Sequence, residues 1–453
     1  MQKVRLQWDN LRASFWFLPS MMVTVTMAFA ILLIELDYGG FTQWLNRWPR
    51  FFGVEAQGAR QILSTLAGSM MTIMSITFSM TLLALVLASG QYTSRILRNF
   101  MRSRVTQSTL GVFASIFAYC LIVLRTIRGT GNGDIEQFVP SLAVFFAFVM
   151  SLVGVVVLIY FIHHIASSIQ ASSIIASVAQ ETNAAIDRLL PIKSDYEKEN
   201  EPNDPLAESL DERTWYPVPA KKSGYIQDVN LDTLLSEACL NRTIVRMERG
   251  IGEFLVQDTP LVSLALTYPP EQTLINALNA AYSISRHRTV KQDPAFGIRQ
   301  IEDMAIKALS PGVNDTSTAV MCVDYLTAIL ARLAGRQFPS RYRYESQSLR
   351  LVVIAPSFEK LLAQAINQIR GNAEGNVVIV KCLLNSLDCI ASLTHRRGNL
   401  SALDQQVTLI GELSKRSIKC KNEREQVDNL LLKVKHTLYV QADFSREDHA
   451  LHH

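Results

Sequence analysis

The chain has 453 residues, 49% of them apolar, and a formal net charge of +4. So small a net charge gives no reason to expect a nucleic-acid partner, which would require a clustered basic excess. The six cysteines show no C-x-x-C pair and no metal-ligand spacing, so we expect scattered reduced thiols and neither a metal nor a cofactor.

Four long apolar stretches lie in the first 165 residues, and the rest of the chain has the charged composition of a globular domain. They cover residues 15–36, 62–88, 108–127 and 138–163. A bilayer core of roughly 30 Å needs about 20 residues of helix, so each stretch predicts a membrane span. We therefore expect an α-helical membrane protein in which four transmembrane helices precede a cytoplasmic α+β domain.

Four spans place the N-terminus, the 89–105 loop and everything after residue 163 on one side of the membrane. That side carries the basic excess, whereas the opposite loops mix basic and acidic residues. The basic residues are Lys3, Arg5, Arg12, Arg95, Arg98, Arg102 and Arg104. Because an excess of Lys and Arg marks the cytoplasmic side, both termini are predicted to be cytoplasmic.

The second span has no charged residue between Ile62 and Ala88, but one helical face is small and rich in hydroxyls. This face consists of Thr65, Gly68, Ser69, Thr72, Ser75 and Ser79. It allows two interpretations. Small residues let helices pack closely, which favours a dry packing seam. Hydroxyls can replace part of the hydration shell of a solute, which favours the lining of a pathway.

An arginine patch follows the second span. Arg95, Arg98 and Arg102 are spaced three and four residues apart, so they share one helical face, and Arg104 follows them. These side chains would concentrate anions at the inner mouth of a pathway or bind lipid headgroups.

The fourth span has no stop signal at the membrane surface. Residues 155–190 contain no glycine or proline, which predicts one continuous helix that extends far into the cytoplasm and ends before Pro191. A stripe of small and apolar residues along this extension, including Ile165 and Ala179, predicts packing against a second copy or against the chain's own cytoplasmic domain.

The remainder divides into four segments by composition. Residues 193–222 are acidic and contain several prolines, so they predict a linker. Residues 223–270 alternate short β-prone runs with turn residues and predict a small β-rich unit. Residues 271–440 show helical periodicity and predict a helical domain, with 441–453 as a flexible tail.

The most distinctive cytoplasmic stretch lies between the first helices of that domain. Its candidate ligand-binding residues are Arg286, Arg288, Asp293, Arg299, Asp303, Asn314 and Asp315. Two predicted helix N-termini beside three arginines could hold a phosphate or carboxylate anion. The alternative is an ion-pair network that holds a helical hairpin together.

Four stretches resemble a known family: QYTSRILRNF at 91–100, FIHHI at 161–165, QDPAFGIRQ at 292–300 and ALSPGVND at 308–315. They are similar to the domain-of-unknown-function family 2254 of predicted bacterial membrane proteins, and the resemblance covers most of the chain. It implies a bacterial inner-membrane protein with four spans near the N-terminus. It implies no activity.

Three function classes compete on this evidence. The chain lacks a nucleophile elbow, a phosphate-binding glycine loop and an H-E-x-x-H motif, so we do not expect an enzyme. The hydroxyl face and the basic patch favour a homo-oligomeric channel-like or transport-related protein with a cytoplasmic regulatory domain, passing a small anionic or neutral solute. The alternative is a membrane-anchored ligand-binding or regulatory module without a pore.

Overall fold

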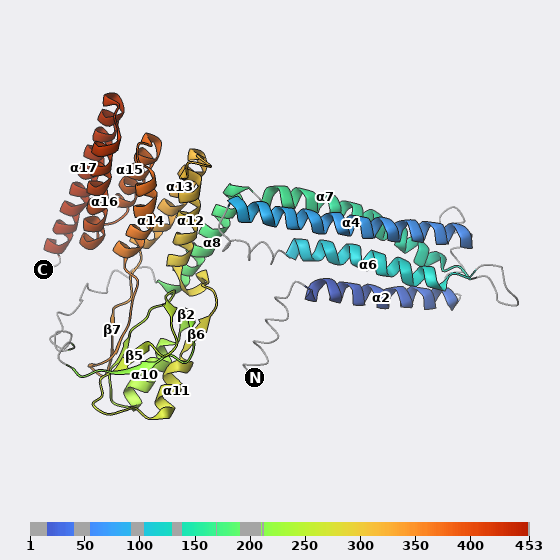
Figure 1. The fold of residues 1–453 in the computed structure, drawn as a ribbon, viewed down its shortest axis with the longest axis horizontal. Coiled ribbons are helices and arrows are strands. Elements are labelled where there is room, and N and C mark those ends of the chain that lie inside the picture. The colour runs from blue at the N-terminus through green and yellow to red at the C-terminus, as the bar shows by residue number, and fades with distance from the viewer. Residues whose placement is uncertain are drawn as a thin grey trace. The chain divides into compact units, whose positions relative to one another are not determined.

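The computed structural model describes residues 16–39, 55–91, 104–128, 138–168, 170–190, 210 and 213–451. The chain forms two compact units, residues 1–173 and 174–453, which are described here one at a time. Most of both units is helical, and the second also contains two β-sheets (Figure 1).

The first unit consists of long apolar helices. They are α2 (Phe17–Tyr38), α4 (Ala56–Gln91), α6 (Arg104–Thr126) and α7 (Ser141–Ser168). Helix α6 packs on the other three, and its buried side includes Phe113, Ile116 and Tyr119. A Cβ atom at Gly111 of α6 would lie 3.2 Å from Pro19 Cα, so glycine permits the close approach of α2 to α6.

Polar contacts at the ends of these helices fix their relative positions. Asp37, near the end of α2, accepts hydrogen bonds from the backbone N–H groups of Leu142 and Ala143 at 3.1 and 3.2 Å, and so caps α7. Arg60 of α4 donates to the carbonyl of Ile127 just beyond α6 at 2.8 Å. Each bond satisfies a backbone group that the helix end leaves free, and each joins two helices.

Five described helices are long and apolar enough to cross a membrane: α2, α4, α6, α7 and α13 (Thr316–Ala334). The first four overlap the four predicted spans, and α4 and α6 begin before the predicted limits. The fifth candidate belongs to the second unit.

The predicted continuous helix after the fourth span is wrong. Helix α7 ends at Ser168, Gln170 lies in a bend, and a separate helix, α8, covers Ala171–Leu189. No glycine or proline marks this break in the sequence. Helix α8 belongs, from Ile174 onward, to the second unit.

Helix α8 packs on the rest of the second unit. Two partners were predicted for this stripe, and the structure contains one of them, the chain's own C-terminal domain. Its buried side includes Ile175, Ala179, Thr182 and Ile186. A Cβ atom at Gly297 would lie only 1.9 Å from Thr182 Oγ1, so glycine at this position lets the two helices touch. Two ion pairs add to this packing: Asp187 with Arg332, at 2.7 Å, and Asp187 with Arg336.

Two sheets form the β part of the second unit. The larger has the order β1-β5-β3-β8-β7 and the smaller the order β4-β2-β6. The strands are β1 (Tyr216–Pro219), β2 (Gly224–Val229), β3 (Val245–Met247), β4 (Phe254–Leu255), β5 (Pro260–Leu264), β6 (Tyr282–Ser285), β7 (Tyr342–Glu345) and β8 (Ser348–Val352). Helices α10 (Leu231–Leu240) and α11 (Gln272–Ala280) share their apolar core. All neighbouring strands are antiparallel except β3 and β8, which are parallel.

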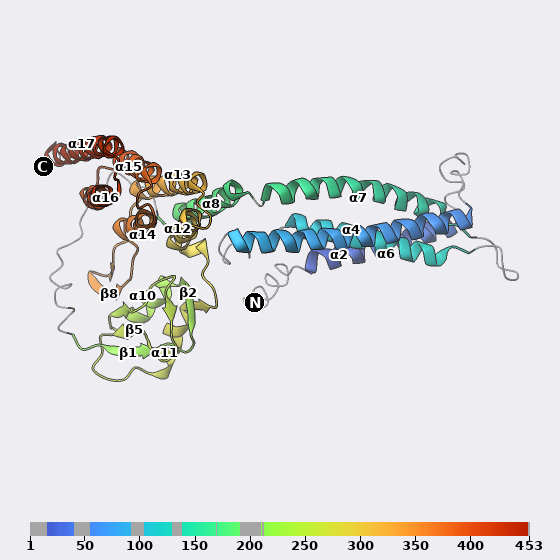
Figure 2. The ribbon, with the colours of Figure 1, turned by 45° about the horizontal axis from the view of Figure 1, so that its top comes forward.

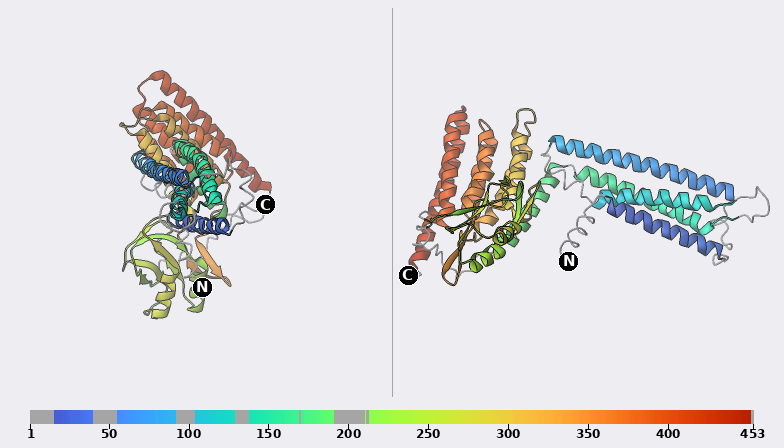
Figure 3. Two further views of the ribbon diagram at one scale, coloured as in Figure 1. Left: turned by 90° about the vertical axis from the view of Figure 1, so that its right-hand side faces the viewer. Right: turned by 60° about the horizontal axis from the view of Figure 1, so that its bottom comes forward.

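Six helices form the rest of the second unit. They are α12 (Pro294–Leu309), α13, α14 (Phe358–Asn372), α15 (Val377–Ala391), α16 (Arg397–Ser417) and α17 (Lys421–Leu451), and a short 3-10 turn, η2 (Val290–Gln292), precedes them. Successive hairpins stack in two layers, with α12, α14 and α16 in one and α13, α15 and α17 in the other (Figures 2 and 3). This stacking resembles that of helical-repeat proteins.

The predicted segment limits need three corrections. Strand β1 lies inside the predicted 193–222 linker, and β6, β7 and β8 lie inside the predicted 271–440 helical domain, so the sheets extend beyond 223–270. The predicted flexible tail from 441 is helical, because α17 continues to Leu451. Arg343, Glu345 and Arg350 interrupt the apolar pattern of β7 and β8, and two prolines give β1 the composition of a linker.

Candidate functional site

The hydroxyl face of α4 points away from the rest of the chain. Thr65, Gly68, Ser69, Thr72, Ser75 and Ser79 are all exposed. The buried residues of α4, which include Leu63 and Met70, lie on the opposite side and join the core made with α6 and α7. A Cβ atom at Gly68 would meet nothing within 4 Å. The face is therefore not a packing seam between the described helices of one chain.

Two of these hydroxyls bond to their own helix. Thr72 Oγ1 donates to the carbonyl of Gly68 and Ser75 Oγ to the carbonyl of Met71, each at 3.0 Å. This i to i−4 bond satisfies the hydroxyl hydrogen without water. The oxygen lone pairs remain able to accept a hydrogen bond from a neighbouring chain, a solute or water.

The outward face of α7 has a different composition. Its exposed residues at helical spacing are Leu152, Val155, Val156 and Ile159, all of them apolar. Such a face suits lipid hydrocarbon. Both helices are long enough to span a bilayer. The exposed side of α4 carries Ile76 and Leu83 among its hydroxyls, whereas the exposed side of α7 is apolar from Leu152 to Ile159 and polar only at its end, at Tyr160 and His163.

The basic patch is described only at its end. Arg95, Arg98 and Arg102 lie outside the described residues. Arg104 is the first residue of α6 and is exposed.

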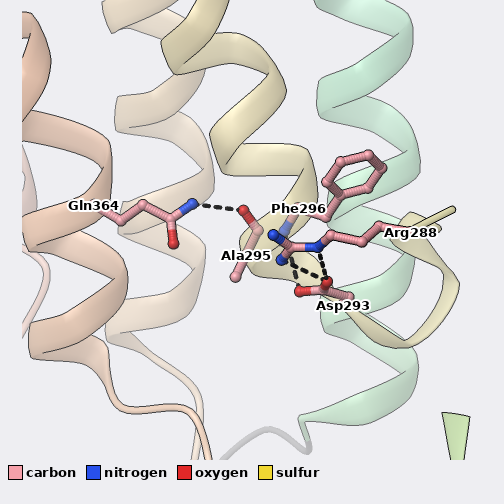
Figure 4. A network of polar contacts seen from close by, with 5 residues as sticks. All are labelled: Arg288, Asp293, Ala295, Phe296 and Gln364. Carbon is pink, nitrogen blue, oxygen red and sulfur yellow. Dashed lines mark hydrogen bonds and ion pairs between the residues drawn. The ribbon is translucent and has the colours of Figure 1, made fainter. Parts of the chain in front are cut away.

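At the start of α12, Asp293 forms an ion pair with Arg288 (Figure 4). Asp293 Oδ2 accepts from Arg288 Nε and Nη2 at 2.9 and 2.7 Å, and Asp293 Oδ1 accepts from the N–H of Phe296 at 3.1 Å. The guanidinium also lies over the Phe296 ring, 5.0 Å from its centroid. Burial raises the pKa of Asp293, and Arg288 opposes part of that rise.

The two helix N-termini do not form one anion site. Asp293 caps α12 and Asp315 caps α13, so a carboxylate of the chain already occupies each N-terminus. The two caps also lie at opposite ends of α12, whose 16 residues span about 24 Å. Arg286 is exposed and forms no ion pair with the described residues. Among the described residues, the ion pairs of this stretch lie within α12 and the segment just before it, and none joins α12 to α13.

Asn314 and Asp315 form the turn between α12 and α13. Asn314 has a φ of 48°, and its N–H donates to the carbonyl of Ser310 at 2.9 Å. Asparagine tolerates this left-handed conformation better than most residues do. Asp315 accepts from the N–H and the hydroxyl of Thr318 at 3.0 and 2.6 Å, and the hydroxyl bond is the largest influence that lowers the pKa of Asp315.

The third cluster lies midway along α12 and includes a residue that the sequence did not single out. Arg299 pairs with Asp303, at 3.1 Å, and with Glu302, at 3.2 Å. Its Nη1 and Nη2 also lie 2.9 and 3.2 Å from the side-chain oxygen of Gln368 on α14, with that amide turned so that its oxygen faces the guanidinium. Arg299 thus connects α12 to α14.

Glu302 is almost completely buried, with 1% of its side chain exposed. Arg299 approaches it, but neither carboxylate oxygen makes a hydrogen bond within the described structure. Burial raises the pKa of Glu302 to about 7, because desolvation outweighs the attraction of Arg299 and the nearby charge of Asp303 adds to the rise. Glu302 shares a helical face with the buried Ile298 and Ala305, four residues before it and three after, but its charge led the sequence analysis to pass over it.

Among the described residues, no group of three or more histidine, cysteine, aspartate or glutamate side chains gathers in a way that could hold a metal ion. All six cysteines are free.

The family model described as Predicted membrane protein (DUF2254) matches residues 12–388. Uncharacterized proteins of Mycobacterium tuberculosis and Mycobacterium bovis are 29% identical to the chain over 426 residues, which cover 92% of this chain and 80% of each relative. No solved structure matches the chain. The chain belongs to the DUF2254 family of predicted membrane proteins, as its own sequence stretches indicated.

Proposed function

We propose that this protein is a homo-oligomeric, channel-like protein of the bacterial inner membrane. In this proposal α2, α4, α6 and α7 cross the membrane, both termini are cytoplasmic, and the outward faces of α4 from several copies meet around a water-accessible pathway. The second unit then regulates that pathway from the cytoplasm.

The choice of four spans rests on the surroundings of the fifth candidate. Helix α13 packs between α12 and α15 in the stacked helical layers. It also carries Asp324 and Arg332, and Arg332 pairs with Asp187 of α8. A charged helix inside a compact helical unit is better explained as the core of a water-soluble domain than as a membrane span.

The observation that carries the proposal is the row of small and hydroxyl-bearing residues on the exposed α4 face, which has no counterpart among the exposed residues of α7 from Leu152 to Ile159. Six small or hydroxyl-bearing residues along one face of a membrane helix gain nothing from lipid contact. Contact with other copies of α4, with water between them, uses both their small size and their free lone pairs. The absence of any carboxylate between Ile62 and Ala88 favours a neutral or anionic solute.

The second candidate is a membrane-anchored regulatory module without a pore. The i to i−4 hydrogen bonds of Thr72 and Ser75 favour it, because hydroxyls satisfied in this way can also pack in a dry seam between copies. In that case the ligand-responsive part is the cytoplasmic unit alone.

Cysteine accessibility distinguishes the two candidates. Single cysteines replace Ser69, Thr72 and Ser75 in a chain whose six natural cysteines are changed to serine or alanine, and a membrane-impermeant thiol reagent is applied to vesicles. We expect labelling at these positions. Val156→Cys and Ile159→Cys, on the apolar exposed face of α7, serve as matched controls and should stay unlabelled.

Equal protection of all five cysteines would overturn the pathway and leave the anchored module. Solute flux into liposomes that contain the purified protein tests conduction itself, since only the channel-like protein should increase the flux.

Topology has its own test. A cytoplasmic reporter fused after residue 192 should be active, and a periplasmic reporter placed in the 129–137 segment should also be active. Periplasmic activity of a C-terminal fusion would overturn the orientation, whichever of the two candidate functions holds.

A further inference from the structure

The two ends of the helical stack in the second unit differ in what covers them. At one end α8 lies on the stack, because Gly297 of α12 approaches Thr182 closely and Arg332 of α13 pairs with Asp187. At the other end α17 packs on α15 and α16, and no described segment lies beyond it (Figures 2 and 3). The terminal helices of such a stack need a polar outer face to remain in water.

The contacts of α17 define which of its faces is free. On one side Lys433 pairs with Asp388 of α15 at 2.7 Å, and Thr437 donates to the same carboxylate at 2.7 Å. On another side Leu431 lies 3.5 Å from the position that a Cβ atom of Gly411 in α16 would take. By helical spacing, the residues that point away from both neighbours form the outer face of α17. This face includes Glu425, Asp428, Leu432, His436 and Tyr439.

The outer face of α17 is less polar than that of α16, the other helix at this end. The exposed residues of α16 at helical spacing are Ser401, Gln405, Thr408 and Glu412, all of them polar. On α17, Leu432 and Tyr439 lie two turns apart on one line and are 68% and 65% exposed. Single exposed apolar residues are common on protein surfaces, so the argument for a partner depends on the charges around them.

These charges complement a second copy of the same face. If two α17 helices lie antiparallel with Leu432 of each at a two-fold axis, Asp428 of one copy faces His436 of the other, and Glu425 faces Tyr439. Each carboxylate then meets a group that can donate a hydrogen bond to it. A parallel pair would place each carboxylate opposite its own copy, and such like-charge contacts are unfavourable.

Two lysines near this face fit the same antiparallel pairing. Lys435, next to His436, adds positive charge near Asp428 of the second copy. Lys421, which pairs with Glu425 of its own helix at 3.9 Å, falls opposite Asp443. The sequence of α17 is therefore charge-complementary to itself when it is reversed about Leu432.

We propose that the outer face of α17 binds the same face of a second copy of this chain, with the two helices antiparallel about Leu432. Such a two-fold contact closes on itself and joins two copies. A pair of single helices is smaller than the standard interface of about 1,600 Å², so the contact is weak alone and is strengthened when both copies lie in one membrane. It is separate from the α4 face and does not rest on the proposed pathway.

Cysteine cross-linking of the full-length protein in detergent tests the contact. In the chain whose natural cysteines are changed to serine or alanine, Leu432→Cys should be linked into a dimer by a short bis-maleimide. The rate should be several-fold higher than for Lys433→Cys, the matched control on the α15 side of the same helix. Glu425→Cys and Tyr439→Cys should each link poorly alone, but should link to each other when the two variants are co-expressed.

Charge reversal tests the pairing independently. Asp428→Lys should slow the cross-linking of Leu432→Cys several-fold, because it faces His436 and Lys435 of the second copy. Adding His436→Asp to the same chain should restore the rate. If Asp428→Lys lowers the melting temperature, the cysteine comparisons still decide.

Three outcomes would overturn the proposal: a Leu432→Cys rate no higher than that of Lys433→Cys, self-linking of Glu425→Cys as fast as that of Leu432→Cys, or no link between Glu425→Cys and Tyr439→Cys. Protection of the cysteines placed on α4 would remove the pathway but leave these rates unchanged, so the two proposals fail separately.

Discussion

Helices α4 and α12 both place polar groups in surroundings that are unfavourable to them, but in different ways. Helix α4 exposes Ser and Thr hydroxyls on a face that no other described part of the chain packs against. Two of these hydroxyls, on Thr72 and Ser75, donate to carbonyls of their own helix. Helix α12 buries the carboxylate of Glu302 without a hydrogen bond. A neutral hydroxyl satisfied within its helix costs little, whereas a buried charge costs several kcal/mol. We therefore expect changes in α12 to act on stability and changes in α4 to act on assembly and transport.

The largest effect on stability is expected from Arg299→Ala. The change removes the cation nearest the buried Glu302, one ion pair of Asp303 and the link to Gln368. Because 34% of the arginine side chain is exposed, the loss in unfolding free energy should be about 3 kcal/mol at pH 8, at the lower end for a buried pair. Arg249→Ala, which breaks an exposed pair with Glu253, should cost less than about 0.5 kcal/mol. Equal losses in thermal or chemical unfolding would contradict this reading of the cluster.

The pH dependence of stability should have a defined sign. The pKa of Glu302 is raised from 4.5 to about 7, so the folded state holds this proton more tightly than the unfolded chain does. The contribution of Glu302 to the free energy of unfolding is therefore greatest below pH 4.5. It falls by roughly 3 kcal/mol in total as the pH rises to about 7. Glu302→Met should therefore stabilise the protein by about 2 kcal/mol at pH 8 and change little at pH 4.5. A Glu302→Met protein whose stability falls with pH as steeply as the natural one would show that another group is responsible.

Gly297→Ala should destabilise the second unit through steric overlap. The added Cβ would lie 1.9 Å from Thr182 Oγ1 and 2.9 Å from Thr182 Cβ, so α8 must move away from α12. Overpacking of this kind costs about 1–3 kcal/mol. Gly371→Ala in α14, where a Cβ meets nothing within 4 Å, is the matched control and should be neutral or slightly stabilising. A neutral Gly297→Ala would mean that α8 does not pack closely on α12.

The sequence predicted the elements whose pattern is local. The apolar runs indicated α2, α4, α6 and α7 to within several residues at most ends, and the hydroxyl face of α4 followed from helical spacing alone. Asp293 and Asp315, two of the predicted ligand-binding residues, are instead the caps of α12 and α13, a role that short-range signals favour for aspartate. What these predictions share is that the interacting groups lie within one or two helical turns.

The parts that the sequence did not predict depend on distant segments. Strand β8 forms a local hairpin with β7, but it also pairs with β3, about a hundred residues earlier, and this distant pairing is what places the hairpin in the larger sheet. The break between α7 and α8 occurs in a run of small and polar residues without glycine or proline, where packing of α8 on α12 sets its course. Glu302 lies on the same helical face as the buried Ile298 and Ala305, but its burial is completed by the helices that pack on α12, which are distant in sequence.

The smallest effect on stability, and the sharpest test of the comparison, is expected from Thr72→Val in α4. Valine has nearly the same shape and removes only the hydroxyl, whose hydrogen already bonds to the carbonyl of Gly68. The unfolding free energy should change by less than about 0.5 kcal/mol. If the exposed face lines a wet pathway, however, solute flux into liposomes should fall several-fold, because the Thr72 oxygen is no longer there to accept a hydrogen bond from the solute or its water.

Thr77→Val is the matched control. Thr77 lies on the buried side of the same helix and makes the same kind of bond, to the carbonyl of Ile73, so loss of the Thr77 hydroxyl should leave the flux unchanged. Equal flux in both variants and the natural protein would argue that this face packs against another copy without water between them. A marked loss of stability in Thr72→Val would show instead that hydroxyls on this face stabilise the fold of the single chain.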